Sequence, residues 1–150
     1  TQRAWAQIEK ILPFTDGHEN LTHSPFVMPN SYGENPALNI DGQNMNDWQT
    51  GSSNVLLKVL IRFVFGFEPE LEGLWIQPAR GLLFDRFSFT AQCRNTPVHL
   101  EYVNKKQGER TYTVNGERMP GTTDAACALE KLWLPADRLM GVPLEIRITD

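Results

Sequence analysis

DWQTGSSNVLLKVLIRFVFG, residues 47–66, contains the most apolar segment of the chain and decides how the rest is arranged. Within residues 55–65 only Lys58 and Arg62 are polar, and they lie four apart on one narrow stripe. A helix that is apolar on nearly every side is expected to be buried on several sides, and this one is too short to span a membrane. Gly66 is the expected C′ residue, because glycine adopts the left-handed conformation at little cost.

The residues that open this predicted helix are suited to binding an anion. Thr50, Ser52 and Ser53 are all N-cap residue types, and Gly51 lies among them. Small side chains at this point let a ligand approach the free backbone N–H groups of the first turn, which bind anions well. Plain helix capping explains the same residues, and from spacing alone it is the more frequent explanation.

Composition narrows the class of protein. The chain has 150 residues and a formal net charge of −4, with no basic run, so nucleic acid is not an expected partner. Cys93 and Cys127 lie in no metal-ligand spacing and are interpreted as free thiols of a reducing compartment, which favours a cytoplasmic location. We see no signal peptide and no membrane-spanning run. The chain opens as if already inside a helix, which is the pattern expected of a fragment.

One helical segment and one irregular segment precede the central helix. Residues 1–12 place apolar side chains on one helical face, and Pro13 closes that segment. Residues 13–51 are rich in Pro, Gly, Asn and Asp, which predicts a long ordered loop packed by its own aromatic side chains. Several of its residues are of the types that line sugar sites, although Asx-turns and loop packing explain each one singly. These residues are Asn30, Tyr32, Glu34, Asn35 and Trp48.

The same loop offers only weak metal-binding patterns. His18 and His23 lie five apart near two carboxylates, a spacing that matches no metal-site template. Residues 41–47 resemble a calcium loop faintly but lack the alternating carboxylates, and Ser52 stands where the bidentate Glu belongs. We therefore predict no metal site.

After Gly66 the pattern changes to short strands. The hairpin signal Asn115-Gly116 is the clearest single turn in the chain. His99 alternates outward with Glu101 and is expected to be a solvated strand residue rather than a catalyst. Strands at this spacing indicate an antiparallel β-sandwich or jelly roll. The predicted strands cover residues 74–78, 84–91, 98–102, 110–114, 117–119, 129–134 and 144–148.

Several motifs, taken in order, resemble the C-terminal part of the inverting glycoside phosphorylases of glycoside hydrolase family 94. They are PNSY at residues 29–32, WQTGS at 48–52, FGFEP at 65–69 and LEGLWIQP at 71–78. The set is specific, while each piece alone is weak. This resemblance implies an α+β chain: residues 1–66 would be the end of an (α/α)6 catalytic barrel with the active-site loop 13–51. Residues 67–150 would be a C-terminal β-sandwich.

The resemblance also implies an activity. The family cleaves a β-glycosidic bond with inorganic phosphate as co-substrate and no other cofactor, and it releases an α-sugar 1-phosphate. By position, Thr50, Gly51 and Ser52 would bind phosphate, and Asn30, Tyr32 and Trp48 would contact the β-linked glucan or oligosaccharide. The general-acid Asp of the family has no motif match here and is expected upstream, so the isolated chain is expected to be inactive. Many members carry Trp where Val55 stands, which leaves the substrate open.

Two other functions fit the sequence. A carbohydrate-binding β-sandwich without chemistry would use the strand aromatics Trp75, Tyr102, Tyr112 and Trp133, although core packing explains them at least as well. A structural domain that supports the barrel, with a possible homodimer contact, is the third interpretation. Because the central helix would pack on the rest of a parent chain, the isolated chain is expected to expose an apolar patch or to bury it by oligomerisation.

Overall fold

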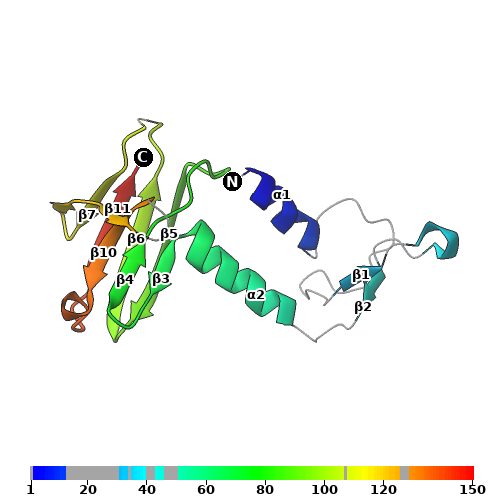
Figure 1. Cartoon of the computed structure of the whole chain (residues 1–150), viewed down its shortest axis with the longest axis horizontal. Helices are drawn as coiled ribbons and strands as arrows, with labels where there is room; N and C mark the ends of the chain where they lie inside the picture. The colour runs from blue at the N-terminus through cyan, green and yellow to red at the C-terminus, as the bar shows by residue number, and fades with distance from the viewer. Residues whose placement is uncertain are drawn as a thin grey trace. The chain divides into compact units, whose positions relative to one another are not determined.

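A computed structural model describes most of the second half of the chain and parts of the first. The described residues are 2–12, 31–33, 35–39, 43–45, 51–106, 108–125 and 129–150. Among them the chain is mostly β, with two short α-helices (Figure 1). It divides into two compact units, Thr1–Leu60 and Ile61–Asp150. The domain boundary expected at residue 66 and the (α/α)6 barrel remain predictions.

The first unit contains the predicted N-terminal helix, and Ile8 on its apolar face is buried. A small two-stranded antiparallel sheet, with Tyr32 opposite Asn44, lies in the segment where the sequence indicated only an irregular loop. Pairs this short have no amphipathic period that a sequence pattern could detect. The elements are α1 (Gln2–Ile11), β1 (Ser31–Gly33), η1 (Pro36–Leu38), β2 (Gln43–Met45) and α2 (Gly51–Val59).

The central helix differs from its prediction in two ways. The α-helix ends at Val59, and a π-helical turn, η2 (Leu60–Val64), follows in place of further α-helix. No residue of α2 is buried: Val55 and Leu57 are 61% and 57% exposed, and Phe63 in η2 is 63% exposed. The prediction of a helix buried on several sides is therefore wrong for the chain by itself. Within the described residues, Val55, Leu57 and Phe63 are each exposed, while the apolar patch expected of the isolated chain stays a prediction.

Gly66 ends the helical segment in the left-handed conformation, as predicted, with φ of +69°. A Cβ at this position would come within 1.9 Å of the backbone carbon of Gln77. The close approach lets the Gln77 N–H donate to the Gly66 carbonyl at 2.8 Å. Only glycine satisfies both the torsion and the approach.

The second unit contains two sheets (Figure 1). The four-stranded sheet has the order β3-β4-β10-β9, and the five-stranded sheet has the order β5-β6-β11-β7-β8. Every strand predicted after residue 66 is present, whereas β3 and β9, with three residues each, were not predicted. The strands are β3 (Phe67–Pro69), β4 (Gly73–Ile76), β5 (Arg86–Cys93), β6 (Thr96–Val103), β7 (Thr111–Val114), β8 (Glu117–Met119), β9 (Thr122–Asp124), β10 (Leu129–Pro135) and β11 (Leu144–Thr149); η3 (Ala136–Arg138) follows β10.

One pairing corrects the prediction of a wholly antiparallel fold. The last strand, β11, lies between β6 and β7, and it runs parallel to β6 and antiparallel to β7. The chain leaves β6, builds β7 to β10 across both sheets, and returns beside β6 in the same direction. Alternation of apolar residues fixes which face of a strand is buried but carries no information on the direction of its neighbour.

The core lies between the two sheets and is formed by alternate residues of both. Phe67 on β3 contacts Phe89 on β5, with ring centroids 5.7 Å apart, so the buried faces meet. The Tyr112 hydroxyl also donates across to the Glu130 carbonyl at 3.2 Å. This arrangement is sandwich-like. The most completely buried aliphatic side chains are Leu74, Ile76, Val98, Leu100, Leu132, Leu134, Ile146 and Ile148.

Candidate functional site

The start of α2 is the candidate anion site. The helix begins at Gly51, which is exposed, and no atom of the described residues lies within 4 Å of where its Cβ would stand. Ser52 and Ser53 are half-buried. The first four N–H groups of an α-helix have no partner within the helix, and they carry the positive end of its dipole. None of the described residues therefore crowds the backbone at Gly51. Thr50 lies outside the described residues.

The predicted sugar-contacting residues are described only in part. Asn30 and Trp48 lie outside the described residues, and for Tyr32 only the backbone, in β1, is described. Asn35 is an N-cap whose side-chain oxygen accepts from the Ala37 N–H at 3.1 Å. This is the Asx-turn geometry that explains such a residue without a ligand.

The sequence predicts no metal site. His18, His23 and residues 41–42 lie outside the described residues, as does Cys127. Within the described ranges, no three His, Cys, Asp or Glu side chains are grouped so as to hold a metal ion. Cys93 is a buried free cysteine, and burial raises the pKa of its thiol although the nearby Arg94 opposes the shift. Among the described residues, neither α1 nor α2 has the length and apolar run needed to cross a bilayer.

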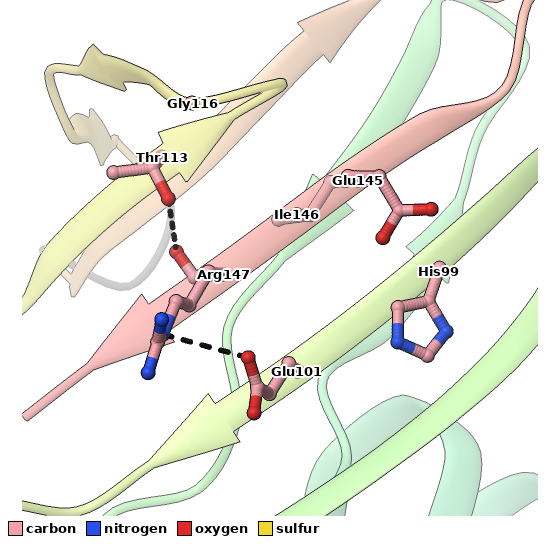
Figure 2. Close-up of a pocket in the computed structure, with 7 residues that line it drawn as sticks. All are labelled: His99, Glu101, Thr113, Gly116, Glu145, Ile146 and Arg147. Atoms are coloured by element: carbon pink, nitrogen blue, oxygen red, sulfur yellow. Dashed lines mark hydrogen bonds and ion pairs between the residues drawn. The ribbon is translucent and has the colours of Figure 1, made fainter.

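A polar depression of about 410 Å³ lies on the outer face of the five-stranded sheet (Figure 2). His99 and Glu101 on β6 stand opposite Glu145 and Arg147 on β11, because these residues pair directly in register. Arg147 Nε lies 3.5 Å from Glu101 Oε2, and Thr113 lies beyond it on β7.

The contacts of this depression are those of a solvated sheet face. Glu101 also pairs with Arg86, with the nearest N and O atoms 2.5 Å apart, so two arginines balance one carboxylate. His99 Nδ1 lies 3.0 Å from the Thr90 hydroxyl. The side chains of Arg86 and Arg147 are 72% and 55% exposed, and ion pairs of such exposed residues contribute little to stability. The outward position predicted for His99 is confirmed.

A buried polar network closes one end of the sandwich-like unit. Arg110 Nε and Nη2 donate to the two carboxylate oxygens of Asp150 at 2.5 and 2.6 Å, and Nη1 donates to the Pro78 carbonyl at 2.7 Å. The Tyr102 hydroxyl donates to the same carboxylate at 3.0 Å. The arginine and aspartate side chains are only 3% and 12% exposed. Sequence reasoning missed this network, because nothing in the pattern distinguishes Arg110 from a surface arginine.

The pKa values of the network follow from this geometry. Burial alone would raise the pKa of Asp150, but the hydrogen bonds and charge of Arg110 outweigh it and hold the pKa below its ordinary value. Burial, and then the hydrogen bond to Asp150, raise the pKa of Tyr102 to about 12. Each polar group here has a protein partner, so the network is structural and stabilises the end of the unit.

The four strand aromatics separate into two pairs. Tyr102 and Tyr112 are 0% and 1% exposed and belong to the core, so neither can contact a sugar, contrary to the binding-module hypothesis. Trp75 on β4 and Trp133 on β10 are directly opposed on the outer face of the four-stranded sheet, with ring centroids 4.4 Å apart. Only this second pair remains available to a ligand.

The chain matches no protein-family model and no curated protein sequence.

Proposed function

We propose that this chain is the C-terminal segment of an inverting glycoside phosphorylase that acts on β-linked glucans or oligosaccharides. The ordered motif set of residues 29–32, 48–52, 65–69 and 71–78 supports the proposal. The single structural observation that favours it is the start of α2, where Gly51 is exposed and no described residue lies within 4 Å of its Cβ position. A site of this kind accepts an oxyanion through backbone N–H groups.

In the proposed mechanism this chain supplies the phosphate-binding residues. The N–H groups of Gly51 and Ser52, with the hydroxyl of Thr50, hold inorganic phosphate in line with the anomeric carbon. A phosphate oxygen forms the new bond to that carbon as the glycosidic bond breaks on the opposite face. The leaving oxygen takes its proton from a general-acid aspartate elsewhere in the parent polypeptide. The products are an α-sugar 1-phosphate and the shortened sugar.

The exposed apolar side chains of the helical segment fit the same proposal. Val55 and Leu57 on α2 and Phe63 in η2 are 61%, 57% and 63% exposed, and residues two apart on a helix lie on different sides of it. In the proposed enzyme they pack against preceding helices of an (α/α)6 barrel. The unit Ile61–Asp150 would then be the C-terminal β-domain.

The test uses the polypeptide encoded by the complete open reading frame that contains this chain. It is incubated with cellobiose or cello-oligosaccharides, with and without inorganic phosphate, and products are followed by ³¹P and ¹H NMR. The proposal expects phosphate-dependent release of an α-configured sugar 1-phosphate. Release of free glucose at the same rate without phosphate, or an encoded polypeptide with no activity on any β-glucoside, would refute it.

The alternative is a non-catalytic β-sandwich module that binds carbohydrate or supports a neighbouring domain. The outward Trp75–Trp133 pair is the observation that favours sugar binding. The two functions differ in what they require of the α2 start. Substituting Thr50 raises the KM for phosphate in the enzyme and leaves sugar binding by a non-catalytic module unchanged.

A further inference from the structure

A row of three outward side chains crosses the four-stranded sheet. Glu68 on β3 is opposite Trp75 on β4, and Trp75 is opposite Trp133 on β10. The row spans two inter-strand spacings, about 9.5 Å. None of the three side chains belongs to the sandwich core, because the inward residues of these strands, such as Leu74 and Leu134, fill it. The row therefore lies on the outer face of the sheet, outside the sandwich core.

The indole of Trp133 lies across the sheet over a glycine. A Cβ at Gly73 would meet the Trp133 ring atoms Cζ2 and Cη2 at 2.8 Å. Because Gly73 has no side chain, the Trp133 indole packs directly against the β4 backbone, and its plane is tilted 43° to the ring of Trp75. Both tryptophans are half-buried, so each keeps part of its ring surface in contact with solvent.

Charged groups beside the pair are held in place by one another. Lys131 Nζ lies 2.7 Å from Asp124 Oδ2, 3.8 Å from Glu68 Oε2 and 5.6 Å from the centroid of the Trp75 ring. Glu68 also pairs with Arg62. The side chains of Lys131, Asp124 and Glu68 are 12–21% exposed, so little further ordering is needed when a ligand binds.

We propose that this row, Glu68–Trp75–Trp133, is a binding site for a neutral β-linked glucose oligosaccharide. The proposal is independent of the phosphorylase activity. Gluco-configured rings carry their hydroxyls at the edge and C–H groups on both faces. The indoles take the C–H faces, while fixed carboxylate oxygens accept from edge hydroxyls. An apolar protein partner would instead have to desolvate three ion-paired groups at the edge of the pair, which is costly.

The test is calorimetric titration of the 150-residue chain with cellohexaose, repeated on single variants. We expect saturable binding that weakens about tenfold in Trp133→Ala, since an aromatic contact of ~1.4 kcal/mol corresponds to that factor. Glu68→Gln is expected to weaken binding about fivefold through a poorer acceptor. Glu101→Gln, the matched change on the outer face of the other sheet, leaves the affinity unchanged.

Three results would overturn the site. The first is the absence of saturable heat with cellohexaose. The second is an affinity of Trp133→Ala for cellohexaose equal to that of the wild-type chain. The third is self-association of the wild-type chain in sedimentation that Trp133→Ala abolishes, which would make the face a protein interface. If Trp133→Ala does not fold, Trp133→Tyr keeps a ring over Gly73, and a threefold weakening supports the site while unchanged affinity refutes it.

Discussion

Substituting Arg110 by Met tests whether the buried network stabilises the second unit. The substitution removes three hydrogen bonds of 2.5–2.7 Å and leaves the Asp150 carboxylate buried beside Tyr102 without its cation. Breaking a buried ion pair by removing one partner costs about 3–5 kcal/mol. Since domains are stable by only about 5–15 kcal/mol, this is a large fraction of the total.

The assay is urea denaturation followed by far-ultraviolet circular dichroism. With a denaturant slope of about 1–3 kcal/mol per M, the midpoint falls by roughly 2 M urea in Arg110→Met. Arg147→Met is the matched control, because its ion pair with Glu101 is exposed and contributes less than about 1 kcal/mol. Equal, small shifts in the two variants would refute the account. A double variant with Asp150→Leu should recover part of the loss, because no buried charge is then left unpaired.

Further predictions follow from single residues. The lowered pKa of Asp150 means that the unfolded chain binds protons first, so stability is lost as pH falls below about 3.8, and Asp150→Asn flattens that fall in acid titrations. Gly66→Ala should cost about 2–4 kcal/mol in urea melts, because φ is +69° and the new Cβ would meet Gln77 at 1.9 Å; a neutral result would contradict this geometry. Phe63→Ser, at a 63% exposed position, should reduce binding of a hydrophobic dye and change stability by less than about 0.5 kcal/mol. In a Cys127→Ser background, Cys93 should react with a thiol reagent only after unfolding, because it is buried and its thiol pKa is raised; rapid labelling of the folded chain would show otherwise.

The strands were predictable because their signals are local. Alternation along β5, β6 and β10 separates buried from exposed residues, and Asn115-Gly116 marks the β7–β8 hairpin. The partner of β11 was not predictable, since its parallel pairing with β6 depends on where the chain returns after β7 to β10. Apolar pattern also failed for α2, where it indicated burial that nothing in the described chain supplies.

The candidate sites, like the strands, were predictable where the signal is local and not where it depends on distant parts of the chain. Small polar residues before an apolar run predict a helix start near Gly51 and Ser52, and α2 begins at Gly51. The Trp75–Trp133 pair could not be separated from the core residues Tyr102 and Tyr112 by residue type. Cross-strand register decides which aromatics face outward together, and register is set by the whole sheet rather than by either strand.

The most direct test of the central claim is the KM for phosphate of the full-length Thr50→Val enzyme. Loss of one hydrogen bond to a charged group should raise the phosphate KM about tenfold or more and leave the KM for the sugar nearly unchanged. Thr123→Val, a matched change at an exposed residue of β9, should alter neither constant. An unchanged phosphate KM in Thr50→Val would contradict the assignment of the α2 start as the phosphate site.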